Sequence, residues 1–188
     1  MIRELQTRRN EFESAIVAVR ELVTGLTDET FNKRPDDDRW SVAECVDHLV
    51  TIGTRMLPRM NAAVADARAR GWLAEPPFRY GRLGNWFVRA MGDDQLPPRN
   101  RLRAPRLYRP PPEADRTITE AVEAFATVQD DFIAIVQAAD GLDLARVKIA
   151  SPVTRLLRLS LGQWLKGLSG HQRRHIWQAT QVKKGLRH

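Results

Sequence analysis

The sequence predicts an all-α fold: a four-helix bundle with one long irregular crossover connection. Four long segments repeat apolar residues at steps of three and four, which places these residues on one face of a helix. Three of the segments open with a capping box, and none shows the period-two alternation typical of amphipathic strands. A chain of 188 residues with 43% apolar and 28% charged residues suits one domain with a sizeable core, so we expect residues 1–188 to form a single domain.

The first helix is predicted over about residues 2–25, because apolar residues recur there with the helical period. Its apolar stripe consists of Leu5, Phe12, Ile16, Val19, Leu22 and Leu26. Residues 27–39 are mostly polar and include Pro35. We therefore expect a loop between the first and second helices.

The second helix is predicted to begin after Ser41 and to end near Gly71. Ser41 and Glu44 have the spacing of a capping box, in which each side chain bonds the backbone N–H of the other residue. Trp40 stands directly before this cap, where it can pack against the first turn. The apolar stripe continues through Cys45, Leu49, Ile52, Met56, Met60 and Val64.

The connection over residues 72–116 is predicted to be irregular. Prolines at 76–77, 97–98, 105 and 110–112 interrupt any long helix, although a short amphipathic helix is expected at about 82–91. A connection of this length in a compact domain is usually a functional loop or a poorly ordered segment. The Arg/Pro-rich stretch 97–112 either clamps an anionic substrate or forms a solvated surface loop. Its arginines are Arg99, Arg101, Arg103, Arg106 and Arg109.

The third helix is predicted over about residues 117–141, where Thr117 and Glu120 form a second capping box. Its stripe consists of Ile118, Val122, Phe125, Phe132, Ile135 and Ala139. Residues 142–159 are expected to be a connection to the last helix. A third capping box, Ser160 with Gln163, opens that last helix.

The net charge of +7 comes from 30 basic and 23 acidic residues, and it favours an acidic substrate or a polyanionic partner. Nucleic-acid binding is nevertheless not expected, because only Tyr108 is interleaved with the arginines as a stacking aromatic residue.

No segment approaches the ~20 apolar residues that cross a bilayer. The first residues lack the apolar core of a signal peptide, so we expect no membrane association and a cytoplasmic location.

A single cysteine, Cys45, excludes an internal disulfide and a cysteine-rich zinc module. Cys45 lies in the apolar stripe of the second helix, so we interpret it as an inert core residue. Any metal ion must therefore be held by histidine or carboxylate side chains.

Two histidines, His171 and His175, are four residues apart on the last helix, so their rings project from the same face. The seam in which they lie also contains Leu161, Trp164, Leu168, Ala179 and Val182. The two side chains should therefore point into the bundle. Two buried imidazoles must stay neutral, and a shared divalent cation is the natural partner of neutral imidazole.

His48 lies on the second helix close to its core-facing stripe, between Cys45 and Ile52. If the second and last helices are neighbours, His48 can complete a site of three histidines with open coordination positions. The alternative is a core histidine that bonds a backbone carbonyl. Sequence spacing alone leaves both interpretations open.

Two segments carry a resemblance to a known family, the DinB-like (YfiT-like) superfamily. The first is Arg34-Pro35 followed by W-S-V-A-E-C-V-D-H-L at 40–49, which is similar to the family's W-S-[IV]-x-E-x-x-x-H-L segment. The second is H-Q-R-R-H-I-W-Q at 171–178, which is similar to its C-terminal H-x-x-x-H helix. The order and separation of the two segments also fit the family.

This resemblance implies a four-helix bundle of up-down-down-up topology and a homodimer. It also implies that His48, His171 and His175 bind one divalent transition metal ion of the nickel, zinc or iron class. Relatives include transferases and isomerases that use low-molecular-weight thiols such as mycothiol or bacillithiol. The long 72–116 segment departs from the more compact members of the family.

Other polar residues are candidates for supporting roles. Glu44 and Asp47 flank His48 and could offer a carboxylate to its ring. Glu44 is better explained by the capping box, and Asp47 is expected to face solvent. Asn85 and Trp86 are candidates for lining a substrate entrance.

The leading functional hypothesis is a metal-dependent hydrolase or thiol transferase that uses the metal as a Lewis acid. Its substrate would be a small molecule, such as a thiol or another anionic compound. An alternative is a non-catalytic metal-binding or stress-response bundle. A basic nucleic-acid-binding protein is a further, weaker alternative.

Overall fold

The computed structural model describes residues 1–92, 97, 108–110, 115–151 and 156–186. Four long helices dominate these residues, and two short helices and a two-stranded sheet accompany them. The long helices are α1 (Arg3–Val23), α3 (Val42–Ala69), α5 (Ile118–Ala138) and α6 (Leu161–Gly185). The short elements are α2 (Asp28–Asn32), α4 (Arg82–Met91), β1 (Lys148–Ala150) and β2 (Arg158–Ser160).

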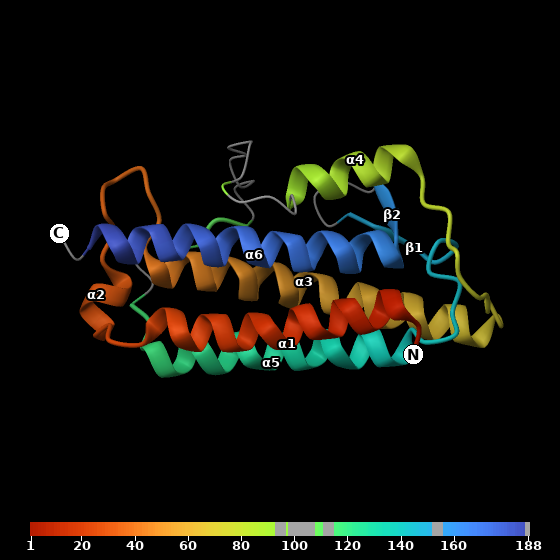
Figure 1. Ribbon diagram of the computed structural model, residues 1–188, viewed down its shortest axis with the longest axis horizontal. Coiled ribbons are helices and arrows are strands. Elements are labelled where there is room, and N and C mark those ends of the chain that lie inside the picture. The colour runs from red at the N-terminus through yellow and green to blue at the C-terminus, as the bar shows by residue number, and fades with distance from the viewer. Residues whose placement is uncertain (93–96, 98–107, 111–114, 152–155, 187–188) are drawn as a thin grey trace.

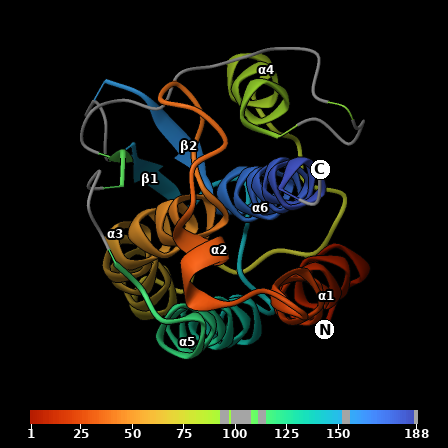
Figure 2. The same cartoon turned by 90° about the vertical axis from the view of Figure 1, so that its left-hand side faces the viewer.

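The four long helices form the predicted bundle (Figures 1 and 2). Helix α1 packs against α5 and α6, and α3 packs against the same two helices from the other side. In Figure 1, α1 and α6 run in one direction, and α3 and α5 run in the other. The order along the chain is therefore up-down-down-up. Because α3 and α6 are neighbours, the residues of these two helices can build one site.

The three predicted capping boxes are present and fix where the long helices begin. The Ser41 hydroxyl accepts a hydrogen bond from the Glu44 backbone N–H at 3.1 Å, and the Glu44 carboxylate accepts one from the Ser41 N–H at 2.8 Å. The boxes at Thr117 and Ser160 have the same reciprocal pattern. Each box satisfies N–H groups that the first turn leaves without partners. The helix start at Ser41 places His48 in the second turn of α3.

The predicted loop at 27–39 contains a short helix that the sequence analysis missed. Helix α2 is capped by Thr27, whose side chain accepts a hydrogen bond from the Thr30 backbone N–H. Its one apolar anchor is Phe31, which is fully buried. A helix of five residues is too short to show a period, so only the Thr27 cap could have indicated it.

The predicted connection at 142–159 also contains regular structure. Strands β1 and β2 pair in antiparallel register, with Ile149 opposite Leu159. Both of these side chains are buried against the bundle. Strands of three residues do not show a recognisable alternation, so the sequence analysis, which expected only a connection here, did not predict them.

Helix α4 confirms the short helix predicted at 82–91, and it lies outside the bundle against α6 (Figure 2). Gly84 and Val88 form its buried face, whereas Leu83 and Trp86 are exposed. A Cβ atom at Gly84 would lie 2.3 Å from the Gln163 side chain. Glycine at this position therefore permits the close contact between α4 and α6.

The interior consists of two apolar clusters at opposite ends of the bundle. One contains Phe12 and Phe132, whose rings stack at 5.1 Å, and the other contains Phe31 and Phe125. The predicted histidines belong to neither cluster. Within the described part of the chain, no helix is both long enough and apolar enough to cross a membrane.

Candidate metal centre

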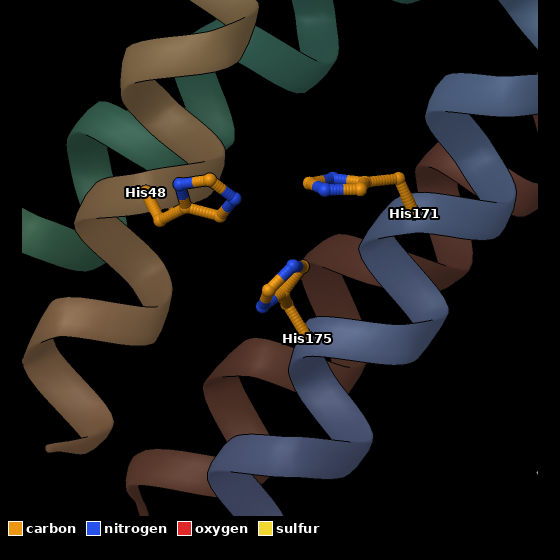
Figure 3. Close-up of side chains that lie close together, drawn as sticks. All are labelled: His48, His171 and His175. Carbon is orange, nitrogen blue, oxygen red and sulfur yellow. The ribbon is translucent and has the colours of Figure 1, made fainter. Parts of the chain in front are cut away.

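Helices α3 and α6 bring the three predicted histidines together (Figure 3). His48 comes from α3, and His171 and His175 come from successive turns of α6. Their ring centroids are 5.2 Å apart for His48 and His171, 4.5 Å for His48 and His175, and 4.4 Å for His171 and His175. One nitrogen atom from each ring lies within 4.8 Å of the others. This spacing suits one ion with zinc-to-nitrogen distances of about 2.0–2.1 Å after small side-chain adjustments.

His48 has a defined tautomer because its Nδ1 lies 2.6 Å from the backbone carbonyl oxygen of Tyr108. A carbonyl oxygen only accepts hydrogen bonds, so Nδ1 carries the proton and donates it. The lone pair of the ring is then on Nε2, which is the atom free to bind a cation. Metal-binding histidines commonly have this arrangement, in which the second ring nitrogen donates to a carbonyl or carboxylate.

Burial keeps all three imidazoles neutral. Desolvation is the main cause that lowers the pKa of His48. It also lowers the pKa of His171 to about 3, where an imidazolium would in addition be repelled by a protonated His48 and by Arg174. The pKa of His175 is also well below its ordinary value, first because of burial and then because of the other two histidines and Arg174. Neutral imidazole is the form that binds a metal.

The donor set fits a divalent transition metal. His175 is 8% exposed, and its Nδ1 is buried without a hydrogen-bond partner among the described residues. A buried polar atom without a partner is costly, and a coordinated cation would satisfy this one. The cluster contains no carboxylate or thiol in the described part of the chain. Three imidazoles favour zinc, nickel, copper or iron over magnesium or calcium, which prefer oxygen ligands.

The Trp40 ring covers one side of the site. It lies 4.9 Å from the His48 ring and stacks at 5.8 Å on the His175 ring. The backbone of Gly92 packs on α6 next to His171, so closely that a Cβ atom at Gly170 would lie 2.7 Å from the Gly92 oxygen. The sequence suggested Trp40 only as a packing residue before the cap. Its contact with the histidine rings depends on how α3 and α6 pack.

The sequence profile of the DinB superfamily matches residues 11–179 of the chain, which include all three histidines. The chain belongs to the DinB superfamily. The matched region extends from α1 to the last turns of α6, so it includes every helix of the bundle.

Two relatives from Bacillus subtilis resemble this DinB superfamily member over most of its length. The uncharacterized protein YuaE of strain 168 is 24% identical over 162 residues, which cover 86% of this chain and 88% of YuaE. The solved structure of YfiT matches 99% of this chain and 90% of its own, with a TM-score of 0.62 and 13% identity. YfiT is described as a "probable metal-dependent hydrolase with an unusual four-helix bundle topology". At this identity the likeness to YfiT establishes the shared fold.

Glu44 is not part of the histidine cluster and serves the start of α3 instead. It is 6% exposed, closes the capping box and pairs with Arg34 from the preceding loop. The Arg34-Pro35 element of the DinB-like resemblance thus has a structural explanation. The ion pair fixes the loop before α3 and, with it, the position of Trp40.

The expectation that Asp47 faces solvent was wrong. Asp47 is 8% exposed and forms an ion pair with Arg116 at 3.2 Å. Burial raises the pKa of its carboxyl, and the nearby Arg116 opposes this shift. Residue 116 lies immediately before the Thr117 cap, so this pair joins the start of α5 to α3. The pair could not be predicted from the sequence, because the partners are 69 positions apart.

Cys45 is an inert core residue, as predicted. It is 1% exposed, and burial raises the pKa of its thiol. The stripe of apolar residues in α3 therefore indicated its role correctly. Cys45 is not available as a nucleophile in the folded protein.

The other candidate site residues have mixed outcomes. Asn85 accepts a hydrogen bond from Gln163 at 3.0 Å, so it joins α4 to α6. Trp86 is 61% exposed on the outer face of α4. Arg99, Arg101, Arg103 and Arg106 lie outside the described residues, so the proposed arginine clamp stays a prediction.

Proposed function

We propose that this DinB superfamily protein is a metal-dependent enzyme that acts as a hydrolase. The observation that supports the proposal is a cluster of three neutral imidazoles with no fourth histidine, cysteine or carboxylate ligand among the described residues. Three protein ligands leave a coordination position for an exchangeable molecule, which is the arrangement of catalytic rather than structural metal sites. His171 is also half-buried rather than fully buried, so the site is not sealed from solvent.

The protein residues have definite tasks in this proposal. His48, His171 and His175 hold the cation, and the Tyr108 carbonyl orients the ring of His48. Trp40 covers two of the three rings and limits the access of water. When bound, a divalent cation supplies Lewis acidity, which lowers the pKa of a nucleophile so that its anion exists at neutral pH.

Neither nearby carboxylate is free to act as a base toward a nucleophile at this site. Glu44 is engaged by Arg34 and by the Ser41 backbone, and Asp47 is engaged by Arg116. This differs from the H-E-x-x-H enzymes, in which a glutamate between the histidines is the general base. The residues between His171 and His175 are Gln172, Arg173 and Arg174.

A thiol is the second candidate nucleophile. The same site would lower the pKa of a small thiol and direct its anion to an electrophile, which is transfer rather than hydrolysis. The neutral donor set favours this, since three imidazoles and a divalent cation leave a net positive charge that attracts a thiolate. Thiol transfer would also fit the resemblance to DinB-like enzymes.

An activity screen tests the proposal. Metal-free protein would be loaded in turn with nickel, zinc and ferrous iron, then assayed with nitrophenyl esters and with small thiols plus a bimane electrophile. We expect turnover with one metal, loss on chelation, and loss in His175→Ala but not in Gln181→Ala, an exposed residue of α6. Turnover that needs only water supports the hydrolase, and turnover that rises with thiol concentration supports the transferase. Equal activity with and without the metal would refute both.

The alternatives predict other outcomes. A non-catalytic binding bundle would hold its metal without turnover and would exchange it slowly. A nucleic-acid-binding protein would bind DNA or RNA with an affinity that falls steeply as salt increases. The cluster of three histidines has no role in that second alternative.

A further inference from the structure

The metal ligand His48 is held in place from outside the four-helix bundle. Its hydrogen-bond partner, Tyr108, belongs to the long Arg/Pro-rich connection and is 60 positions away in the chain. We propose that Tyr108 is a positioning residue: by burying its side chain on α3, it sets the tautomer and orientation of His48 for metal binding. This inference rests on the proposed metal site and assigns a task to a segment whose purpose the sequence did not show.

The contact between the two residues is short and shielded from water. The His48 Nδ1 and the Tyr108 carbonyl oxygen are 2.6 Å apart, and the two residues are 2% and 3% exposed. Water therefore does not compete for this carbonyl in the folded state. If the carbonyl moved away, the His48 proton would be free to occupy either ring nitrogen. A proton on Nε2 would block the atom that faces the other histidines.

The Tyr108 side chain is what anchors the carbonyl. Its ring is buried, and the Arg55 guanidinium carbon lies 5.6 Å from the ring centre. Arg55 is two turns along α3 from His48, so ring and carbonyl contact the same helix. The Tyr108 hydroxyl has no hydrogen-bond partner among the described residues. The anchor is therefore the aromatic ring and not the hydroxyl group.

The arrangement couples two events. A cation on Nε2 fixes the Nδ1–H tautomer of His48, and this tautomer is the one that bonds the Tyr108 carbonyl. Linkage is reciprocal. A Tyr108 whose ring is buried on α3 therefore strengthens metal binding, and bound metal stabilises this buried position of Tyr108 by the same factor. Outer partners of metal-binding histidines typically change metal affinity by about 10–100-fold.

Two tyrosine variants test the proposal, namely Tyr108→Ala and its matched control Tyr108→Phe. The first readout is the His48 tautomer in metal-free protein, measured from the ring nitrogen shifts in long-range ¹H–¹⁵N spectra and assigned with His48→Gln. The second is zinc affinity, measured by competition with a chromophoric chelator. Circular dichroism confirms that each variant is folded. Arg55→Ala, which removes an exposed side chain over the ring, tests the same anchor without a change in the core.

We expect wild type and Tyr108→Phe to have the Nδ1–H tautomer and equal zinc affinity. Tyr108→Ala should give a mixture of tautomers and a zinc affinity about 10–100-fold lower, and Arg55→Ala a smaller change in the same direction. An unchanged tautomer in Tyr108→Ala, or an equal loss in Tyr108→Phe, would overturn the proposal. If wild type bound no metal, the proposed function would fail, and the tautomer measurement would still decide the role of Tyr108.

Discussion

At the scale of single residues, the three histidines form a cluster of bases in which His48 and His175 are buried and His171 is half-buried. Much of their ordinary solvation is replaced by packing against one another and against Trp40. Neutral imidazoles tolerate this environment, but imidazolium ions would lose solvation and repel each other. The free energy of unfolding of the metal-free protein must therefore depend on pH.

The sign of this dependence follows from the lowered pKa values. In the unfolded chain histidine has its ordinary pKa of about 6.5, whereas the pKa of His171 in the folded protein is about 3. Between these values the unfolded state binds more protons, so stability is full above pH ~6.5 and falls as the pH decreases toward ~3. We expect the melting temperature of metal-free wild type to fall more between pH 7 and pH 4 than that of His171→Gln/His175→Gln. Parallel melting curves for the two proteins would contradict this account of the histidines.

Sequence reasoning at this scale succeeded where a residue's task depends on its own helix. The spacing of His171 and His175, and the position of His48 in the α3 stripe, were readable because helical geometry fixes which side chains share a face. Trp40 and Tyr108 were not readable as parts of the site. Their roles arise from contacts between segments that are distant in sequence, and local pattern contains no information about such contacts.

At the scale of elements, the beginning of α3 controls the position of His48. The Ser41–Glu44 capping box defines the first turn, and Arg34 adds a charged partner for the Glu44 carboxylate. The box itself was predictable from two residues at the correct spacing. The Arg34 pair was not, because an arginine ten positions before a glutamate has many possible partners.

We predict that Arg34→Ala destabilises the protein, because it leaves the buried Glu44 carboxylate with one partner fewer. The expected loss in the free energy of unfolding is about 1–2 kcal/mol, kept modest because Arg34 remains partly solvated. Urea denaturation measures this loss. The matched control is Arg39→Ala, whose pair with Asp36 is exposed on both sides, so the free energy of unfolding should stay close to that of wild type. Equal effects of the two substitutions would show that Arg34 does not stabilise α3.

At the scale of the whole molecule, a buried polar pair links two helices across the bundle. Gln129 of α5 and Gln172 of α6 are 0% and 4% exposed and share one hydrogen bond of 2.7 Å. Each glutamine keeps one buried polar atom without a partner among the described residues. Such a pair reduces stability and can fix the position of one helix relative to another. Here it joins the histidine helix to α5.

A double-mutant cycle tests this role of the glutamine pair. Gln129→Leu or Gln172→Leu alone leaves a buried amide without its partner, and each should lower the free energy of unfolding by about 1–3 kcal/mol. The double variant removes both amides, so its stability should return to that of wild type or exceed it. Thermal or urea denaturation gives the three values. Additive losses in the double variant would refute a pairwise interaction.

The overall fold was largely predictable from the sequence, because four long amphipathic stripes and their caps limit the possible architectures. Helix α2 and the β1–β2 pair were not predicted, because both are too short to show a period. The five residues of α2 make less than two helical turns, and each three-residue strand is too short to show a repeated alternation. The neighbours of each helix were not deducible from periodicity. The adjacency of α3 and α6, on which the three-histidine site depends, followed only from the resemblance to the DinB-like superfamily and is visible in Figure 2.

We propose that His48, His171 and His175 bind one divalent transition metal ion. Elemental mass spectrometry of purified protein tests it most directly, with wild type, His48→Ala, His171→Ala/His175→Ala and the control Gln181→Ala compared at matched folding by circular dichroism. We predict about one ion per chain in wild type and in the control, and none in the histidine variants, because removing one or two of three ligands costs most of the affinity. A metal-free wild type, even after incubation with nickel, zinc or ferrous iron, would contradict the claim and leave a helical bundle with buried core histidines.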